Sequence, residues 1–289
     1  MAEPGTTQRT VCYRHPRVET GLSCVTCERP ICTDCLVQGP VGHRCPECAG
    51  VPAGPRRQVR KVAKASERAP TGIVTYTLIV LNVVVFVAQL LSAGDARGTS
   101  GEIFQNGALY GPYVADGEWW RLITAAFLHG GLVHLAFNML FLWWFGRSLE
   151  AFLGPGRYIG IYVVSALAGS AGSLLLAPTT PTVGASGAVF GILGAGLLLE
   201  RGKGIAIFGG QALLLVVINL ALSFVLASVS VGGHIGGLVG GALCMLALEH
   251  FGRHRPLLSR EGAAALGTLV AIGLVSVLIA YAKVRGLAG

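Results

Sequence analysis

From residue 71 onward the chain alternates between long apolar runs and short polar loops. Runs of this length and low charge predict membrane-spanning helices, because about 20 apolar residues cross the hydrocarbon core of a bilayer. The runs lie near residues 73–92, 121–145, 158–177, 186–200, 205–226, 233–250 and 263–282. The pattern therefore predicts an all-α polytopic membrane domain of seven helices over residues 71–289.

The first 70 residues follow a different pattern. Residues 1–50 are polar and rich in cysteine and histidine, and residues 51–70 form a basic linker without apolar periodicity. We therefore expect a small N-terminal domain at 1–50, which we call the head, then a linker at 51–70. The N-terminus shows no short apolar stretch followed by a small-residue cleavage site. We thus expect no secretory signal and a head in the reducing cytosol.

Composition and charge support a membrane protein. Only 12% of the residues are charged, against about a quarter in an ordinary soluble domain. The net charge of +8 comes largely from a basic cluster in the linker, of a kind that typically flanks a first membrane helix and contacts anionic lipid. The cluster lacks interleaved aromatic residues, so we expect membrane lipids and no nucleic acid as partners. Its members are Arg56, Arg57, Arg60, Lys61, Lys64 and Arg68.

The loops between the runs predict the orientation, since lysine and arginine favour the cytoplasmic side. The alternate loops at 93–120, 178–185 and 227–232 carry only Arg97, whereas the other loops are basic. We therefore expect a multi-pass protein, in the plasma membrane, with the N-terminus in the cytoplasm and the C-terminus outside. Lys283 and Arg285 run against this rule at the last helix. The basic loop residues are Arg147, Arg157, Arg201, Lys203, Arg253, Arg255 and Arg260.

The fourth run is too short to cross the membrane alone. From Ser186 to Glu200 a helix rises about 21 Å, whereas the hydrocarbon core is about 30 Å thick. With Glu200 at the cytoplasmic face, Ser186 lies below the outer surface. Residues 182–185 are then irregular backbone at membrane depth, which is tolerated only where it is buried in protein or lines water. We expect a hydrated cavity that is open to the outside and contains Ser186.

Ser186 lies between two glycines in the sequence GASG, at the start of this predicted helix. Free backbone N–H groups and the positive helix end can hold an anion there. Taken alone, the motif is more typical of helix packing in membranes.

The sixth run places His234 on a helix with glycine stripes at positions 233, 237, 241 and 232, 236, 240. The fourth run has a matching small-residue stripe at positions 187, 191 and 195. Such faces allow close backbone approach and would bring Ser186 and His234 to the same depth. The pair predicts a serine nucleophile and a histidine general base, with a structural histidine as the alternative.

His134 and Asn138 in the second run are four residues apart and share a helix face. Both side chains can donate to one oxygen, so with the backbone N–H of Ser186 they predict an oxyanion hole of three donors. The alternative is that they only hold helices together. No acidic residue is placed by this topology to complete a triad, so we expect a Ser–His dyad.

These motifs, with Trp120-Arg121 in the first outer loop, occur in the order and spacing typical of the rhomboid family, which the chain resembles over residues 73–250. The resemblance implies a six-helix core with one extra C-terminal helix and a serine protease that needs no cofactor for catalysis. It also implies transmembrane protein substrates, cleaved near the outer membrane boundary. Structural roles follow for Trp120 and Arg121, stacking of Phe190 beneath His234, and anchoring of the end of the second helix by Glu150.

The head carries four ligand pairs in C-x-x-C or C-x-x-H spacing: Cys12 with His15, Cys24 with Cys27, Cys32 with Cys35, and Cys45 with Cys48. Eight such ligands fit two structural tetrahedral Zn²⁺ ions, and the segment has too little apolar content to fold without them. The order resembles a B-box or RING-like cross-brace, in which alternate pairs share an ion, although a sequential arrangement is also open. We expect His43 to be a neighbour of the ligands, and the head to dock a cytosolic partner rather than to ligate ubiquitin.

Three other functions are weighed against the protease. A catalytically silent rhomboid-like protein would bind membrane clients, but the catalytic residues are intact. A zinc site formed by His129, His134 and His234 lacks a nearby carboxylate to act as base. A transporter would leave GASG and His234 unexplained.

Overall fold

The computed structural model describes residues 10–39, 42–49, 72–225, 229–252 and 259–287. The chain divides into two compact units, Met1–Lys61 and Val62–Gly289. The expected basic linker lies outside the described residues.

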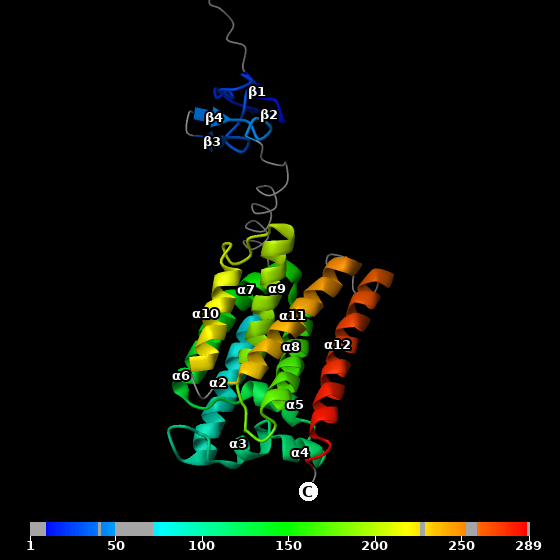
Figure 1. Ribbon diagram of the computed structural model, residues 1–289. Helices are drawn as coiled ribbons and strands as arrows, with labels where there is room; N and C mark the ends of the chain where they lie inside the picture. The colour runs from blue at the N-terminus through cyan, green and yellow to red at the C-terminus, as the bar shows by residue number, and fades with distance from the viewer. Residues whose placement is uncertain (1–9, 40–41, 50–71, 226–228, 253–258, 288–289) are drawn as a thin grey trace, which may run out of the picture. The chain divides into compact units, whose positions relative to one another are not determined.

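The head contains two small antiparallel sheets (Figure 1). Strand β1 (Val11–Cys12) pairs with β2 (His15–Glu19), and β3 (Val37–Gly39) pairs with β4 (Gly42–Arg44). Its buried centre consists of cysteines and one large aliphatic residue, Ile31. A core made of thiols agrees with the expectation that apolar burial alone does not hold this unit together.

The second unit is a bundle of helices (Figure 1). In chain order the helices are α2 (Ile73–Ala93), α3 (Glu102–Gly107), α4 (Gly111–Ala115), α5 (Arg121–Thr124), the 3₁₀-helix η1 (Ala125–Phe127), α6 (Leu132–Phe141), the π-helix η2 (Leu142–Gly146), α7 (Arg147–Leu153), α8 (Pro155–Leu176), α9 (Ser186–Lys203), α10 (Ala212–Val225), α11 (Val231–Phe251) and α12 (Arg260–Val284).

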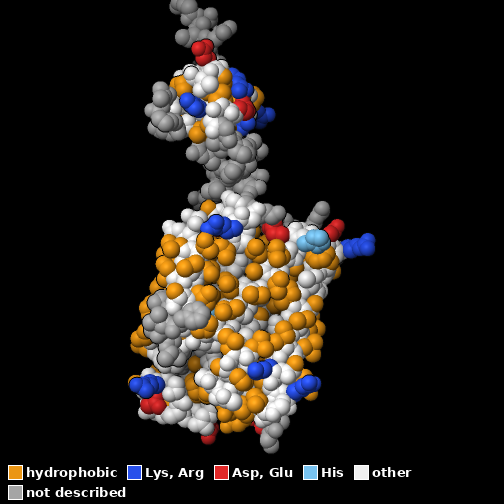
Figure 2. Space-filling view, in the orientation of Figure 1, with side chains coloured by type: hydrophobic (Ala, Val, Ile, Leu, Met, Phe, Trp, Pro, Cys, Tyr) orange, Lys and Arg blue, Asp and Glu red, His pale blue; other side chains and the backbone are white. Residues whose placement is uncertain are grey.

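The length and composition of these helices confirm an all-α polytopic membrane protein. In the described residues, α2, α8, α11 and α12 are each long and apolar enough to cross a membrane, and the bent α5–α7 segment makes a fifth candidate. Hydrophobic side chains dominate the visible side of this unit, while charged side chains gather toward its two ends (Figure 2). The two other helices, α9 and α10, complete the seven expected segments.

The second segment is not the single helix that its hydrophobic run suggests. It breaks between residues 127 and 132, and its two parts are bent by 93°. Gly131 adopts a φ of +135°, which residues with a side chain rarely do. At the break, the buried Gln89 side chain accepts a hydrogen bond from the backbone N–H of His129 at 3.0 Å. It also donates one to the C=O of His129 at 3.1 Å. A polar residue of the first span thereby satisfies backbone that a membrane would otherwise leave unpaired.

The fifth helix also differs from expectation, because it begins at Ala212 and not near residue 205. The carboxylate of Glu200 accepts backbone N–H groups of Phe208, Gly210 and Ala212 at 2.7, 3.1 and 2.8 Å. Glu200, near the end of α9, therefore fixes the loop and caps the start of α10. The apolar residues of this loop made it indistinguishable from helix in the hydrophobic pattern.

Helices α9 and α11 pack with their backbones in contact. A Cβ on Gly237 would overlap the carbonyl oxygen of Gly187, and one on Gly241 would overlap that of Gly191. The matching of these two stripes is confirmed, and it allows the close approach that small residues permit in membranes.

The second glycine stripe of α11 contacts α8, a neighbour that the sequence did not identify. A Cβ on Gly232 would overlap the carbonyl oxygen of Gly172, and one on Gly236 would overlap that of Ala168. Helix α11 is thus pressed between α8 and α9, which limits the freedom of the residues near its N-terminal end.

Candidate active site

Ser186 is the first residue of α9 and is half-buried. The first N–H groups of a helix have no intrahelical partner, so the N–H of Ser186 is available to an anion. The preceding backbone is irregular, as expected: Thr182 pairs with Leu109 in an isolated β-bridge, and the N–H of Gly184 donates to the C=O of Ala125 at 2.9 Å. Leu109, in the segment between α2 and α5, and η1 therefore hold the chain that leads into Ser186.

A small pocket of about 30 Å³ adjoins Ser186. A space of this size is large enough to hold a water molecule. Its walls include Gly184, Ser186, Gly187, Ser173, Ser230 and Gly233. The pocket joins the start of α9 to the turn of α11 that precedes His234.

His234 is buried on α11, with 6% of its surface exposed. Its ring stacks on Phe190 of α9, with centroids 4.0 Å apart and planes at 18°, which confirms the expected stacking. Nδ1 lies 2.5 Å from Oγ of Ser223 on α10, whereas Nε2 has no hydrogen-bond partner among the described residues. Among the described residues, no hydrogen bond joins Ser186 to His234. The two residues nonetheless lie on turns in contact, since a Cβ on Gly187 would be 3.4 Å from the C=O oxygen of Gly233.

His134 directs one edge of its ring toward Gly184, two residues before Ser186. A Cβ placed on Gly184 would lie 2.8 Å from Nε2 of His134 and 3.8 Å from Oγ of Ser186. The N–H of Gly130 donates to Nδ1 of His134 at 3.3 Å, so in the neutral ring the hydrogen is on Nε2. The structure thus offers an N–H donor beside the serine, as an oxyanion hole requires.

The position of Asn138 supports its predicted role as an oxyanion donor less directly than that of His134 does. Its Nδ2 donates to the C=O of His134, one turn earlier in the same helix, at 2.9 Å, and the residue is 5% exposed. The described residues give it no contact with Ser186. Of the three predicted donors, the N–H of Ser186 and the His134 ring lie on either side of Gly184, whereas one N–H of the Asn138 amide is bonded to its own helix.

A metal site formed by membrane histidines finds no support in the described residues. His129 is fully buried with neither ring nitrogen hydrogen-bonded, and its ring centroid is 5.2 Å from that of His134. Among these residues, the groups with metal-ligand spacing occur in the head and do not include His129, His134 or His234.

The segment between α2 and α5, expected to be the first outer loop, is organised around Arg121, which is 2% exposed. Its guanidinium pairs with Glu118 at 2.5 Å and donates to the C=O groups of Gln105 and Ala108 at 2.6 and 2.7 Å. Trp120 donates its indole N–H to Asn106 at 3.0 Å. These bonds agree with the structural role expected of Trp120 and Arg121.

Glu150 ties the end of the second segment to the start of the first. Its carboxylate accepts the N–H groups of Val74 and Thr75, both at 2.9 Å, and the Thr75 hydroxyl at 2.7 Å. The expected anchoring is confirmed, with the N-terminus of α2 as the partner.

The eight head ligands form two groups in the cross-brace order. One comprises Cys12, His15, Cys32 and Cys35, and the other comprises Cys24, Cys27, Cys45 and Cys48, with the ligand atoms of each group within 4.8 Å of one another. The sequential arrangement is therefore not the one adopted. His43 belongs to neither group.

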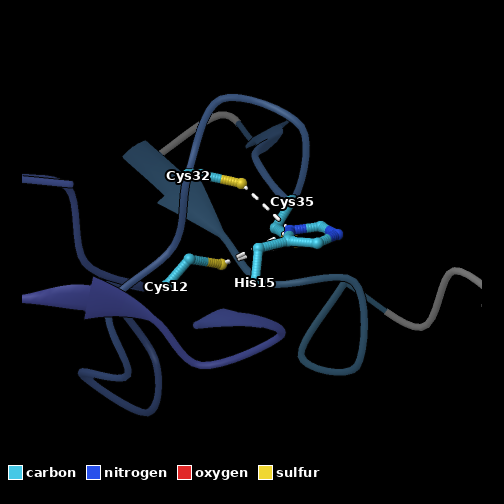
Figure 3. Close-up of side chains that lie close together, drawn as sticks. All are labelled: Cys12, His15, Cys32 and Cys35. Atoms are coloured by element: carbon cyan, nitrogen blue, oxygen red, sulfur yellow. Dashed lines mark hydrogen bonds between the residues drawn. The ribbon is translucent and has the colours of Figure 1, made fainter. Parts of the chain in front are cut away.

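The spacing within the groups fits tetrahedral zinc. Zn–S bonds of about 2.3 Å put two tetrahedral thiolates about 3.8 Å apart. The Sγ atoms of Cys12 and Cys35 are 3.8 Å apart, and those of Cys27 and Cys45 are 3.7 Å apart. In the first group Nδ1 of His15 lies 3.7, 3.3 and 3.4 Å from Cys12, Cys32 and Cys35, so all four donors converge (Figure 3). Both groups could hold a zinc ion.

Each group contains one thiol with a strongly lowered pKa and one with a strongly raised pKa. Burial raises the pKa of Cys12, but hydrogen bonds from backbone N–H groups outweigh it and lower the pKa to about 6. Cys24 follows the same pattern, with its pKa also lowered to about 6. By contrast, burial raises the pKa of Cys35 to about 12. A hydrogen bond with the neighbouring Cys45 thiol raises the pKa of Cys48, also to about 12.

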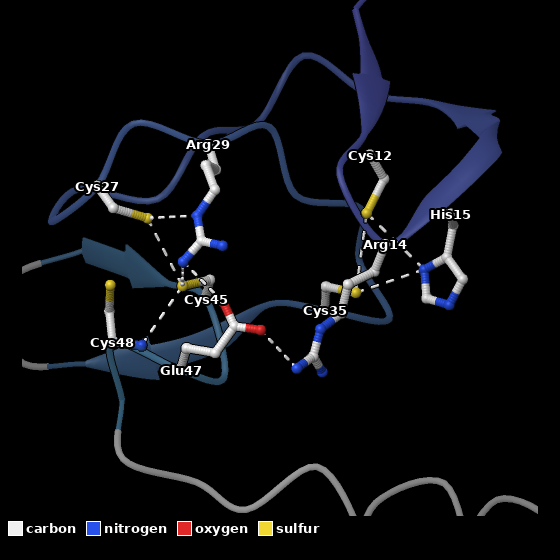
Figure 4. A network of polar contacts seen from close by, with 9 residues as sticks. All are labelled: Cys12, Arg14, His15, Cys27, Arg29, Cys35, Cys45, Glu47 and Cys48. Atoms are coloured by element: carbon white, nitrogen blue, oxygen red, sulfur yellow. Dashed lines mark hydrogen bonds and ion pairs between the residues drawn. The ribbon is translucent and has the colours of Figure 1, made fainter.

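A charged network connects the two groups (Figure 4). Glu47 forms ion pairs with Arg14 and Arg29 at 2.6 and 2.7 Å. Nε of Arg29 donates to Sγ of Cys27 at 3.3 Å, which lowers the pKa of that thiol. The arginine thus favours the thiolate form that a metal needs.

Fold and site together define a polytopic membrane protein with a serine and a histidine on two closely packed helices. Comparison with known proteins assigns its family. The Rhomboid domain model matches residues 116–251. The chain is 35% identical over 210 residues to "Rhomboid protease GluP" of Bacillus subtilis, across 72% of this chain and 39% of that protein. It is 36% identical over 135 residues to "Putative rhomboid protease YdcA" of the same organism, across 45% and 67%. "RHOMBOID-like protein 5" of Arabidopsis thaliana is 40% identical over 143 residues, across 47% and 46%.

The chain belongs to the rhomboid family. The matched segments span between 39% and 67% of the lengths of these three relatives. The match to "Rhomboid protease GluP" over 72% of this chain extends well beyond the segment that the family model covers.

Proposed function

We propose that this protein is an intramembrane serine endopeptidase that cleaves membrane-anchored protein substrates near the outer membrane boundary. Ser186 is the nucleophile and His234 the general base. The observation that carries the proposal is that the two histidines present the same ring nitrogen in opposite roles: Nε2 of His134 is a donor that faces Gly184, two residues before Ser186, while Nε2 of His234 is buried without a partner among the described residues. One histidine can stabilise an anion and the other can take a proton.

The reaction follows from these roles. Nε2 of His234 accepts the Ser186 hydroxyl proton as Oγ attacks the substrate carbonyl carbon. The oxyanion receives hydrogen bonds from the N–H of Ser186 and from His134, with Asn138 as the third proposed donor. The imidazolium of His234 then protonates the leaving amine, and a water molecule, deprotonated by His234, hydrolyses the acyl-enzyme. No cofactor takes part.

The proposed topology has the N-terminus and the head in the cytoplasm and the C-terminus outside, in the plasma membrane. The lysine and arginine distribution of the loops supports it. Two structural zinc ions hold the head, which docks a cytosolic partner or substrate tail. The exposed apolar side chains of Val18, Leu22 and Val25 on the head support a docking role.

Labelling of the purified full chain with a fluorophosphonate probe tests the mechanism. We expect the parent to be labelled at Ser186 and to cleave a model transmembrane substrate. Ser186→Ala should abolish both, and His234→Ala should remove labelling, because an unassisted serine is a poor nucleophile at neutral pH. Cleavage by Ser186→Ala at the parental rate would refute the assignment. An unlabelled parent that still binds the substrate would favour the catalytically silent alternative.

A further inference from the structure

Ser223 is a buried hydroxyl near the C-terminal end of α10 that the mechanism above does not use. It lies on α10, is 3% exposed, and has two polar neighbours. Its Oγ is 2.8 Å from the C=O oxygen of Asn219, one turn earlier, and 2.5 Å from Nδ1 of His234 on α11. The contact with His234 crosses between helices, so tertiary packing creates it.

Counting hydrogens decides the direction of these bonds. A serine hydroxyl has one hydrogen to donate, and a carbonyl oxygen has none. The hydrogen must therefore lie between Ser223 and Asn219, since otherwise two acceptors would face each other at 2.8 Å with no hydrogen between them. Oγ of Ser223 is then an acceptor toward Nδ1, and the hydrogen of that second bond belongs to the imidazole.

The unpartnered nitrogen of His234 agrees with this assignment. Nε2 has no hydrogen-bond partner among the described residues, and it is buried. If Nε2 carried the hydrogen, a buried N–H would be left without an acceptor, which costs free energy. With the hydrogen on Nδ1, Nε2 presents a lone pair, and that is the form a general base needs.

We propose that Ser223 is a positioning residue that holds His234 in the Nδ1–H tautomer, the task that a carboxylate performs in a catalytic triad. The proposal rests on the proposed roles of Ser186 and His234. A neutral hydroxyl orients the ring without placing a charge inside the membrane, where charge is expensive.

The described contacts of His234 include no carboxylate, and three glutamates of the membrane unit have partners elsewhere. Glu118 pairs with Arg121, Glu150 caps α2, and Glu200 caps α10. Ring orientation is therefore shared by two side chains from different helices. Phe190 of α9 holds the face of the imidazole, and Ser223 of α10 holds its edge.

The test uses the full chain in detergent with ¹⁵N-labelled histidine, and a spectrum of His234→Ala identifies the His234 signals. In the parent we expect Nδ1 to be protonated and Nε2 to be unprotonated. Ser223→Ala should lose this preference, and its kcat should fall about tenfold to a hundredfold, less than the roughly 10²–10⁴ that a general base contributes, with little change in KM. Ser223→Thr keeps the hydroxyl and should keep the tautomer.

Ser276→Ala is the matched control. Ser276 is a buried serine of α12 that donates to the C=O of Ile272, one turn earlier, at 2.9 Å, as Ser223 does to Asn219, but among the described residues it has no hydrogen bond with His234. This variant should keep both the tautomer and the rate of the parent.

Two results would overturn the proposal: a parent with the hydrogen on Nε2, or a Ser223→Ala variant with the parental tautomer and kcat. A parent that binds substrate without cleaving it would instead refute the proposed function. The tautomer measurement does not depend on turnover, so the two failures are distinguishable.

Discussion

At the scale of single residues, the site depends on which nitrogen of each histidine carries a hydrogen. The backbone N–H of Gly130 makes Nδ1 of His134 an acceptor, so Nε2 donates. In His234, the proposed bond to Ser223 makes Nδ1 the donor, so Nε2 is the acceptor. Two identical side chains thereby acquire opposite roles from their neighbours.

The oxyanion donors can be ranked by substitution. We expect His134→Ala to lower kcat about tenfold to a thousandfold with little change in KM, as loss of one donor does elsewhere. Asn138→Ala should cost less, because its amide donates to the C=O of His134 and has no described contact with Ser186. Steady-state kinetics on one transmembrane substrate give both numbers. The ranking is wrong if Asn138→Ala loses more kcat than His134→Ala.

The sequence predicted a site of Ser186, His234, His134 and Asn138 because their neighbours form short, ordered motifs. It gave no sign of the proposed role of Ser223, which is one serine in the apolar helix α10 and has no motif around it. Its contact with His234 depends on how α10 packs against α11, and hydrophobic periodicity does not contain that information.

At the scale of elements, each of the seven apolar runs corresponds to a helical segment, and the differences lie where a distant polar residue intervenes. Gln89 stabilises the break at His129, and Glu200 holds the loop before α10. The short helices α3 and α4 of the first outer loop were also not predicted, since each has six residues or fewer. Segments of that length show no periodicity.

The contact between α9 and α11 makes Gly237 sensitive to a single methyl group. A Cβ there would overlap the carbonyl oxygen of Gly187, so Gly237→Ala must force the helices apart. Overpacking of this kind costs about 1–3 kcal/mol. We expect a lower midpoint of thermal unfolding in detergent and reduced probe labelling of Ser186.

Gly267→Ala on α12 is the control for that prediction, because a Cβ at Gly267 has no neighbour within 4 Å. Alanine favours a helix over glycine by up to about 1 kcal/mol, so this variant should be as stable as the parent or slightly more so. Equal destabilisation by both substitutions would show that the backbone contact is not the cause.

At the scale of the whole molecule, the chain combines two units that are stabilised differently. The membrane unit packs apolar helices, whereas the head buries thiols around two groups of ligands. The sequence predicted both ligand groups from the C-x-x-C spacing and favoured the cross-brace that the structure adopts. It could not decide between that pairing and a sequential one, because the choice depends on how the four pairs fold together.

Isolated residues 1–50 should bind two Zn²⁺ and be unfolded without metal. Affinity should fall as the pH decreases, because protons compete with zinc for the thiolates. Binding at neutral pH should also release protons, since the pKa values of Cys35 and Cys48 are about 12 in the metal-free groups. Mass spectrometry and titration between pH 7.5 and 5.5 measure these effects. A stoichiometry near one, or an affinity that does not change with pH, would contradict the cross-brace site.

Removal of the head tests how far the two units act independently. Residues 62–289 form a compact unit of their own that includes Ser186, His234 and His134, so a chain lacking residues 1–50 should cleave a minimal transmembrane substrate at nearly the parental rate. Chelators should leave that activity unchanged, because the described membrane residues contain no group with metal-ligand spacing. The same truncation should change which full-length clients are cut, if the head docks their cytosolic tails. Comparison of one minimal and several full-length substrates separates the effects. A well-folded truncation without any activity would show instead that the head belongs to the catalytic machinery.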